Sequence, residues 1–345
     1  MRIAIISSAL AGKGGMETIF MRLYSLIKND KEIEASFIFT DGIKDKNYIK
    51  AFNSEDVIYH EHKTKISEIF FLFNCLRKNN FDYLIATSKK TLILACYIKK
   101  VLRLKVPIIS WIHFSISKEG MYVNLAKYGD AHFAISKKIY SQIKNIGVDE
   151  KKIFYLPNFI QNTKRSIFPA KNKFIYIGRI EFLGQKNIKE LIDGLANYKE
   201  EWTIDIYGTG DSVSKCQKYI YRKYPNLKYR FNWKGWASNP WSHIYKATAL
   251  LLTSTMEGMP MVLLESMSRG LPVLSSNCPT GPSDIVQTGI NGYLYEMGNL
   301  DDFVRKINEI SKNKMDRNKV KESVNKFNEV NYMAKLKKYL TEIKK

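Results

Sequence analysis

The chain has 345 residues, a length that predicts two domains at about 150 residues each, both large enough to bury a core. Its 45% hydrophobic and 13% aromatic residues, with 9 prolines, exclude a disordered chain, a collagen and a disulfide-stapled small protein. The 55 Lys and Arg residues outnumber the 33 Asp and Glu residues, which gives a net charge of +22. This charge favours an anionic partner. Alternatively, the lysines form a solvated surface that reflects genome composition, because the chain is rich in Lys, Asn and Ile together.

No stretch approaches the roughly 20 apolar residues that span a bilayer, and the longest, Leu92 to Ile98, is followed by two lysines. The apolar run near the start is too short for a signal peptide and predicts a first strand. Four widely spaced cysteines predict reduced thiols. We therefore expect a cytoplasmic protein. Peripheral attachment to the inner face of the cytoplasmic membrane is one explanation of the charge, and Ser311 to Lys345 predicts a basic helical region that could rest on phosphate-bearing lipid.

Short apolar or β-branched runs alternate with longer stretches of helical period, which predicts an α/β fold with parallel sheets. In the first half we expect strands at 2–7, 35–40, 83–87, 108–111, 131–135 and 153–156. Helices are expected there at 17–28, 67–77, 91–102 and 137–146. These elements form one Rossmann-like unit.

Hydrophobic periodicity lapses at 157–172, which predicts a linker, and a second α/β pattern follows it. Strands are expected at 174–177, 203–207, 228–233, 250–253, 272–275 and 293–295, with helices at 189–195, 212–224, 261–269 and 303–312. The predicted domains are therefore residues 1–160 and 161–330. Because open parallel sheets bind ligands beyond the carboxyl ends of their strands, we expect a site in a cleft between two Rossmann-like domains.

The strongest candidate motif follows a predicted apolar strand and opens an amphipathic helix. It begins Glu257-Gly258-Met259-Pro260 and continues to Glu265, so two carboxylates lie eight residues apart. Because proline suits the first turn of a helix, we expect Glu257 in the preceding loop and Glu265 inside the helix. Free amides at the helix start would meet an anionic ligand, and the carboxylates would accept hydrogen bonds from sugar hydroxyls. The alternative is one helix-capping and one exposed glutamate.

Two basic residues, Arg179 and Lys186, follow the strand predicted at 174–177. Gly178 lets the chain turn out of that strand, and two cations at its carboxyl end can neutralise a diphosphate leaving group. In a chain this basic, a solvated loop accounts for the pair equally well.

Two glycine-rich turns and one histidine add candidates at predicted strand ends. Gly14 and Gly15 precede the first helix and Gly208 follows the strand at 203–207, so backbone amides there could face phosphate. The first turn fits neither GxGxxG nor GxxxxGK[ST], which argues against dinucleotide-dependent oxidoreductases and P-loop enzymes. His113 also follows a predicted strand, although a lone histidine is more often a structural group. No Asp-x-Asp occurs, so we expect no metal site and no cofactor.

Taken in order, these motifs resemble the retaining GT-B glycosyltransferases that share an E-x7-E motif. Segments 14–18, 110–115, 184–186, 249–254 and 275–282 are similar to those of lipopolysaccharide galactosyltransferases in that family. The resemblance covers essentially the whole chain. It implies a GT-B fold with an acceptor-binding first domain and a nucleotide-sugar-binding second domain. It also implies a C-terminal helix, residues 331–345, that packs back on the first domain.

The resemblance assigns a role to each candidate. Glu257 would contact the donor hexose, Glu265 the ribose hydroxyls, and Arg179 with Lys186 the diphosphate. In the first domain, Gly15 would let the glycine-rich loop approach the phosphates. There too, the side chain or backbone of the histidine at 113 would touch the donor sugar near the reacting carbon.

The implied reaction moves a hexose, expected to be galactose, from a UDP-sugar to a lipopolysaccharide core or related cell-envelope glycan, with retention and without a metal. Because no carboxylate is obviously placed as a covalent nucleophile, we expect same-face attack, with the departing phosphate accepting the acceptor's proton. The acceptor, a phosphorylated glycolipid or oligosaccharide, is expected to dock on the first domain. There the segment Lys44–Lys65 and the helix before Phe81 carry many lysines.

Two alternatives stay open on the sequence. One keeps the fold but makes the chain a capsule, teichoic-acid or glycoprotein glycosyltransferase that uses UDP-glucose or UDP-N-acetylglucosamine. The other is a non-catalytic protein that binds a nucleotide sugar or nucleic acid. We expect no nucleic-acid partner, because no RNA-type aromatic motif is present.

Overall fold

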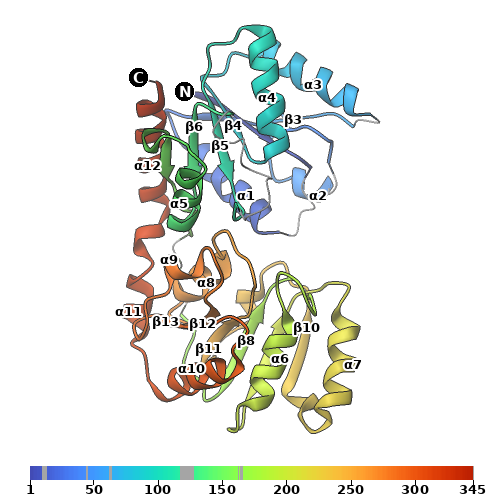
Figure 1. The fold of residues 1–345 in the computed structure, drawn as a ribbon, viewed down its shortest axis with the longest axis vertical. Helices are drawn as coiled ribbons and strands as arrows, with labels where there is room; N and C mark the ends of the chain where they lie inside the picture. The colour runs from blue at the N-terminus through green and yellow to red at the C-terminus, as the bar shows by residue number, and fades with distance from the viewer. Residues whose placement is uncertain are drawn as a thin grey trace. The chain divides into compact units, whose positions relative to one another are not determined.

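The computed structural model describes residues 1–9, 14–43, 46–61, 64–116, 128–161, 163 and 166–344. The chain divides into two compact units (Figure 1). Unit 1 comprises Met1–Phe159 with Glu329–Lys345, and unit 2 comprises Ile160–Asn328. The chain thus passes into unit 2 one residue before the expected boundary and returns to unit 1 two residues before the expected C-terminal helix.

Unit 1 is built on a seven-stranded parallel sheet in the order β3-β2-β1-β4-β5-β6-β7. Its strands are β1 (Arg2–Ser7), β2 (Glu34–Phe39), β3 (Val57–Tyr59), β4 (Tyr83–Ala86), β5 (Ile108–Ile112), β6 (Ala131–Ala134) and β7 (Ile153–Tyr155). Its α-helices are α1 (Gly15–Ile27), α2 (Lys46–Ile49), α3 (Lys65–Lys78), α4 (Lys89–Leu102), α5 (Lys137–Asn145) and α12 (Glu329–Lys344). The central strands are continuous apolar runs because helices cover a parallel sheet on both faces.

Side-chain caps fix where two of these helices begin. Thr64 before α3 and Ser88 before α4 each accept the amide of the third helical residue, and that residue's hydroxyl accepts the cap's amide in return. This reciprocal arrangement satisfies two amides that the helix itself leaves free. It explains why α3 and α4 each start two residues before the predicted positions.

Unit 2 is built on a six-stranded parallel sheet in the order β10-β9-β8-β11-β12-β13. Its strands are β8 (Lys173–Ile177), β9 (Thr203–Tyr207), β10 (Phe231–Gly235), β11 (Ala249–Leu252), β12 (Val273–Ser276) and β13 (Gly292–Tyr295). Its α-helices are α6 (Ile188–Asn197), α7 (Val213–Lys223), α8 (Met261–Met267), α9 (Pro282–Ile285), α10 (Leu300–Lys312) and α11 (Arg317–Glu322). Phe303 of α10 packs into the core against Gly194 of α6. A β-carbon on Gly194 would lie 2.5 Å from the Phe303 ring.

One strand prediction in the second half of the chain is wrong in its bounds. The strand predicted at 228–233 begins only at Phe231, because Pro225 starts a 3-10 helix that occupies Pro225–Arg230. The basic helical region predicted at 311–345 comprises the end of α10, α11, a short 3-10 turn and α12.

The predicted linker, 157–172, contains the boundary between the two units, which lies between Phe159 and Ile160, and its described residues are packed. Phe159 is fully buried against Tyr332, with ring centroids 4.4 Å apart. The amides of Ile160, Ile167 and Phe168 donate to backbone carbonyls of unit 2. The segment is packed, but isolated backbone hydrogen bonds hold it in place of a helix or a strand. Its sequence therefore shows neither helical nor strand periodicity.

Helix α12 packs on unit 1 through Leu336 and Leu340, which are buried. The Tyr83 hydroxyl of β4 donates to the Leu340 carbonyl at 2.6 Å, and Lys344 pairs with Asp82 at 3.1 Å. Lys337 pairs with Asp30 at 2.7 Å, so several lysines of this helix already have acidic partners. Among the helices described, none has the length and apolar character needed to cross a membrane.

Candidate functional site

The candidate residues of unit 2 gather at the carboxyl edge of its sheet. Arg179, Gly208, Glu257 and Thr280 follow β8, β9, β11 and β12, and parallel strands place these ends along one edge. The loops are joined directly: the Thr255 amide donates to the Gln185 carbonyl at 2.8 Å, and the Thr280 hydroxyl donates to the Glu257 carbonyl. The site is therefore assembled from segments about one hundred residues apart.

Lys186 and Glu257 form a buried ion pair at the centre of this edge. The Lys186 Nζ atom lies 2.6 Å from Glu257 Oε1, and only 16% and 9% of the two side chains are exposed. The Thr253 hydroxyl at the end of β11 donates to the Lys186 and Asn187 carbonyls, at 3.1 and 3.0 Å, and so holds the lysine loop beside the glutamate loop. Sequence reasoning assigned the two residues to different parts of one ligand, and the structure brings them into contact.

Arg179 lies in the same loop but is largely open to solvent. Its guanidinium pairs with Glu181 Oε1 at 3.0 Å, and 63% of the side chain is exposed. The second oxygen of Glu181 accepts the Lys186 amide at 3.1 Å, while the Tyr176 hydroxyl donates to the Arg179 carbonyl at 2.8 Å. Glu181 thus holds together the two predicted cations, a role that no sequence motif indicated.

Helix α8 begins as predicted, with Pro260 as its N-cap and no side chain capping it. Glu265 lies inside the helix, and its Oε2 atom accepts the indole N–H of Trp241 at 3.0 Å. The Arg269 guanidinium stacks 4.8 Å from the Trp241 ring centroid. Trp241 lies on a 3-10 turn that the sequence did not indicate, and it fixes one oxygen of the predicted ribose-binding carboxylate.

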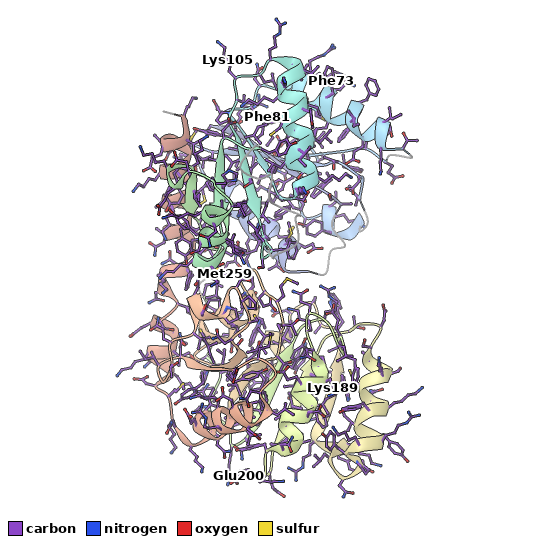
Figure 2. All side chains as sticks on the ribbon, viewed as in Figure 1. Phe73, Phe81, Lys105, Lys189, Glu200 and Met259 are labelled. Atoms are coloured by element: carbon purple, nitrogen blue, oxygen red, sulfur yellow. The ribbon has the colours of Figure 1, made fainter. Side chains whose placement is uncertain are left out.

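The loop before α8 is tightly packed. Gly258, Met259 and Pro260 are all buried, and Figure 2 labels Met259 at this edge of unit 2. Gly281, after β12, has φ +92°, and a β-carbon there would lie 2.7 Å from Pro260 Cδ and 2.9 Å from the Gly258 carbonyl. Gly281 is thus a glycine because the two loops touch, a reason invisible in the sequence.

Gly208 is required by backbone packing. Its φ is +148°, and a β-carbon would lie 1.8 Å from the Gly178 carbonyl oxygen. Its amide donates to the Gly235 carbonyl at 2.8 Å, so this N–H group is already engaged. Contact between Gly208 and a phosphate therefore stays a prediction.

His113 follows β5 in unit 1 and is almost completely buried. Its Nε2 atom has no hydrogen-bond partner among the described residues, and its ring lies 4.5 Å from that of Trp111 in an edge-on arrangement. Burial lowers the pKa of His113 to about 3, so the ring is neutral near pH 7. A buried polar atom without a partner is costly, and a ligand hydroxyl would satisfy it.

Gly14 and Gly15 lie at the start of α1, Gly14 as its N-cap. A β-carbon on Gly15 would meet no atom of the described residues within 4 Å, so among these residues there is open space beside its backbone. The rest of the glycine-rich turn, residues 10–13, lies outside the described residues. That these residues and His113 share one ligand with unit 2 remains a prediction.

Comparison with known proteins identifies the family. The profile of the family described as glycosyl transferases group 1 matches residues 159–327. The chain is also 34% identical to the lipopolysaccharide 1,6-galactosyltransferase of Escherichia coli (strain K12), over 99% of this chain and 98% of that protein. The chain belongs to the group 1 glycosyltransferases.

Solved structures agree with this assignment. The apo form of the lipopolysaccharide outer core galactosyltransferase WaaB superposes on this glycosyltransferase with a TM-score of 0.88, at 31% identity and 99% coverage of both chains. HepE of Anabaena, solved in complex with UDP, shares the fold with a TM-score of 0.81 at 16% identity, over 99% of this chain and 100% of that chain. The two Rossmann-like units are those of the GT-B fold, as predicted.

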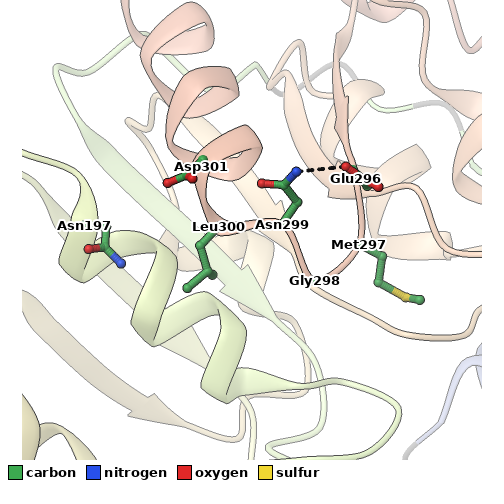
Figure 3. Close-up of a pocket in the computed structure, with 7 residues that line it drawn as sticks. All are labelled: Asn197, Glu296, Met297, Gly298, Asn299, Leu300 and Asp301. Atoms are coloured by element: carbon green, nitrogen blue, oxygen red, sulfur yellow. Dashed lines mark hydrogen bonds between the residues drawn. The ribbon is translucent and has the colours of Figure 1, made fainter.

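The glycosyltransferase also has a surface hollow that contains none of the predicted site residues. It measures about 730 Å³ and is lined by Asn197 and residues 296–301, between β13 and α10 (Figure 3). The Asn299 side-chain amide donates to Glu296 Oε2 at 2.8 Å across it. Elsewhere, no group of three or more His, Cys, Asp or Glu side chains among the described residues is arranged to hold a metal ion.

Proposed function

We propose that this glycosyltransferase transfers galactose from UDP-galactose to a hydroxyl of the lipopolysaccharide core or a related cell-envelope glycan, with retention at the anomeric carbon. The observation that carries the proposal is the buried Lys186–Glu257 ion pair, 2.6 Å long, at the carboxyl edge of the unit 2 sheet. The acceptor and sugar are suggested by the galactosyltransferases that match nearly the full length of the chain. The nucleotide is suggested by HepE, which was solved with UDP.

In this proposal the two cations of the β8 loop receive the diphosphate. Arg179 is exposed and can turn from Glu181 toward a phosphate, whereas Lys186 is held in place by Glu257. Arginine binds phosphate through a planar fork and lysine as a compact point charge, so together they neutralise the charge that develops on the leaving group. Glu257 keeps one carboxylate oxygen for a hydroxyl of the hexose.

Glu265 is proposed to accept hydrogen bonds from the ribose hydroxyls. Trp241 already donates to one of its oxygens, which orients the carboxylate before a ligand arrives. Such preorientation lowers the entropy that binding must remove. The donor would therefore meet a carboxylate that is already oriented.

The proposed reaction breaks the bond between the anomeric carbon and the diphosphate oxygen, and that electron pair leaves with UDP. The acceptor oxygen forms its bond to the same face of the sugar, and its proton passes to the departing phosphate oxygen. No protein nucleophile is required. His113, neutral and with Nε2 unpartnered among the described residues, is proposed to hydrogen-bond a sugar hydroxyl during this step.

We further propose that the reaction needs no metal ion, since the sequence has no Asp-x-Asp to hold one beneath a nucleotide sugar. The net charge of +22 supports a phosphorylated acceptor and peripheral contact with an anionic membrane.

The test measures UDP release from UDP-galactose, UDP-glucose and UDP-N-acetylglucosamine, with truncated lipopolysaccharide as acceptor, with and without a chelator. We expect turnover of UDP-galactose that the chelator leaves unchanged, and an α-linked product by NMR. Glu265→Ala should lower kcat/KM by about 100-fold, whereas Glu322→Ala, at an exposed glutamate of α11, should not change it.

Other outcomes would redirect the proposal. Preference for UDP-glucose or UDP-N-acetylglucosamine would favour a capsule or teichoic-acid type of enzyme on the same fold. A β-linked product would contradict retention, and loss of activity with the chelator would contradict metal independence. Absence of turnover with all three donors would refute the proposed donor class.

A further inference from the structure

Glu190, in the first turn of α6, is a buried carboxylate that accepts three hydrogen bonds. Its Oε1 atom accepts the Tyr295 hydroxyl at 2.8 Å and the Gly298 amide at 3.0 Å. Its Oε2 atom accepts the side-chain amide of Asn187 at 2.5 Å. Only 8% of Glu190 is exposed. An ionised carboxylate can only accept hydrogen bonds, so these three donors take the place of the water that burial removes.

Helix capping does not explain this carboxylate. Asn187 is the N-cap of α6 and Glu190 lies three residues later, which is the spacing of a capping box. In a capping box the N-cap side chain accepts an amide of the first turn, but the Asn187 side chain makes no such bond. It donates to Glu190 instead, and its backbone has left-handed angles, φ 43° and ψ 55°, that residues other than glycine seldom adopt. The pair therefore fixes an unusual backbone conformation at residue 187.

This backbone conformation lies next to the lysine of the candidate site. Lys186 directly precedes Asn187, and the Thr253 hydroxyl donates to the carbonyls of both residues, at 3.1 and 3.0 Å. The Lys186 ammonium group lies 2.6 Å from Glu257, at the end of a flexible side chain that starts from this backbone. Because α6 is packed into the core of unit 2, the angles at Asn187 determine where Lys186 lies relative to the helix.

The other oxygen of Glu190 connects the lysine loop to the end of β13. Gly298, which donates to this oxygen, is part of the wall of the hollow shown in Figure 3. Burial and the charge of Glu190 raise the pKa of the Tyr295 hydroxyl well above its ordinary value, so this group remains a donor. The Tyr295 ring makes an edge-on contact with Phe303 of α10, with ring centroids 5.1 Å apart. One oxygen of Glu190 is thus anchored in the core, and the other holds Asn187.

We propose that Glu190 is a positioning residue for the transfer reaction, which holds Asn187 in its left-handed conformation and so places the Lys186 ammonium group for the diphosphate. Glu190 contacts neither donor nor acceptor and acts only through the lysine loop. The contact between Lys186 and the diphosphate rests on the proposed function, whereas the effect of Glu190 on Lys186 does not. The test therefore includes a measurement on the enzyme without any ligand.

The ligand-free measurement is the rate at which acetic anhydride acetylates Lys186, followed by mass spectrometry of its peptide. Glu190→Met keeps the length of the side chain and removes both oxygens, and it should raise this rate by at least about fivefold because the loop opens locally. Lys306 of α10 is the internal reference, because its side chain is 15% exposed, compared with 16% for Lys186. Its rate should be unchanged. An equal rise at both lysines would show that Glu190 only stabilises the unit and would overturn the inference.

A second substitution separates positioning from stability. Glycine adopts left-handed angles without strain, so adding Asn187→Gly to Glu190→Met should return the Lys186 rate to within about twofold of that of the unmodified enzyme. The thermal stability should not return, because the Tyr295 hydroxyl and the Gly298 amide still lack their acceptor. A Lys186 rate that stays raised in the double variant would contradict a role that acts through residue 187.

Turnover tests the connection to the reaction. With UDP-galactose as donor, Glu190→Met should lower kcat by about tenfold, because a misplaced Lys186 stabilises the leaving group less, and leave the KM for the acceptor unchanged. The matched control is Asp205→Asn, at a β9 carboxylate that is 6% exposed and accepts the Asn232 side-chain amide at 3.0 Å. It should lower the thermal stability and leave kcat of the folded enzyme unchanged. Equal losses of kcat in the two variants would count against a specific role for Glu190.

The failures of the two proposals are distinguishable. If the unmodified enzyme turns over no UDP-sugar but Glu190→Met selectively raises the acetylation of Lys186, the proposed function is refuted and the positioning of Lys186 stands. If the unmodified enzyme turns over UDP-galactose and Glu190→Met changes neither the acetylation rate nor kcat, the positioning role alone is refuted.

Discussion

The two units hold their candidate residues in opposite ways. In unit 2 each charged candidate already has a partner within the unit: Lys186 pairs with Glu257, Arg179 with Glu181, and Glu265 accepts from Trp241. In unit 1 the Nε2 atom of His113 is buried without a partner among the described residues.

This difference separates a preassembled site from an unfilled one. Charges are costly to bury alone, so the carboxylates and cations of unit 2 are stable before a ligand arrives only because they are paired. A neutral imidazole can tolerate one unsatisfied nitrogen at a cost of about 1 to 3 kcal/mol. The stability of unit 2 should therefore depend most on keeping the partners of its charged groups. The stability of unit 1 should depend most on keeping its buried histidines neutral.

The largest effect should come from breaking the Lys186–Glu257 pair. Glu257→Gln or Lys186→Gln leaves a buried charge unpaired, which should lower the free energy of unfolding by about 3 kcal/mol. Each should also lower kcat/KM by at least about 100-fold, since both groups are proposed to contact the donor. The double variant should recover most of the stability and none of the activity, as measured by urea unfolding and UDP release.

An exposed pair of similar length serves as the control. Lys144 and Glu150 on unit 1 lie 2.5 Å apart, but about half of each side chain is exposed. Replacing both with glutamine should change stability little, because water screens such pairs. If the exposed pair mattered as much as the buried one, burial would not be the reason for the strength of the unit 2 site.

Acid should destabilise unit 1 selectively. Burial lowers the pKa of His113 to about 3 and that of His132 to about 4, below the ordinary 6.5. Below pH 6.5 the unfolded chain therefore binds protons that the folded chain does not, and the free energy of unfolding falls as the pH falls. At pH 5 each histidine contributes a loss of about 2 kcal/mol relative to pH 7.

Hydrogen exchange of peptides from β5 and β6, compared with β11 and β12, measures this loss. Unit 2 contains one histidine, His243, so its exchange should change little between pH 7 and pH 5 after correction for intrinsic rates. Buried carboxylates with lowered pKa values, such as Asp193 in unit 2, lose their contribution only below about pH 4. Equal acid destabilisation of both units would contradict the assignment to the histidines.

The regular elements of the fold were predictable because parallel strands are continuous apolar runs. β1 and β9 match their predicted ranges, and most other strands differ by one or two residues. The short elements β3, α2 and α9 were missed, since three or four residues carry too little periodicity and form through tertiary pairing. The strand at 231–235 was misplaced because a 3-10 helix that begins at Pro225 occupies the residues where the strand was predicted to start.

The site was predictable only as far as its motifs reach. Glycine after a strand, two cations and two carboxylates eight residues apart are local patterns, and they located Arg179, Lys186, Glu257 and Glu265. Their partners are not local: 71 residues separate Lys186 from Glu257, and 24 separate Trp241 from Glu265. Nothing in one sequence states which distant segments meet, so these pairings came from the structure alone.

The smallest predicted effect, at Gly15, tests whether unit 1 is open to a ligand. A β-carbon at this first residue of α1 would meet no atom within 4 Å in the part of the chain that the structure describes, so Gly15→Ala should fold and gain about 0.5 kcal/mol of stability. If donor phosphates approach the backbone here, the same methyl group should raise the KM for UDP-galactose by about tenfold and change kcat little.

Gly194→Ala in unit 2 should behave in the opposite way. Its β-carbon would lie 2.5 Å from the Phe303 ring, so it should lower stability by about 1 to 3 kcal/mol, while KM is unchanged in the folded fraction. Thermal unfolding and donor kinetics are measured on both variants. Gly15→Ala should change the KM without loss of stability, and Gly194→Ala should lower the stability without a change in KM. A Gly15→Ala enzyme with unchanged KM would show that the space beside Gly15 is not where the donor lies, and would leave Gly14 and His113 as the candidates in unit 1 for donor contact.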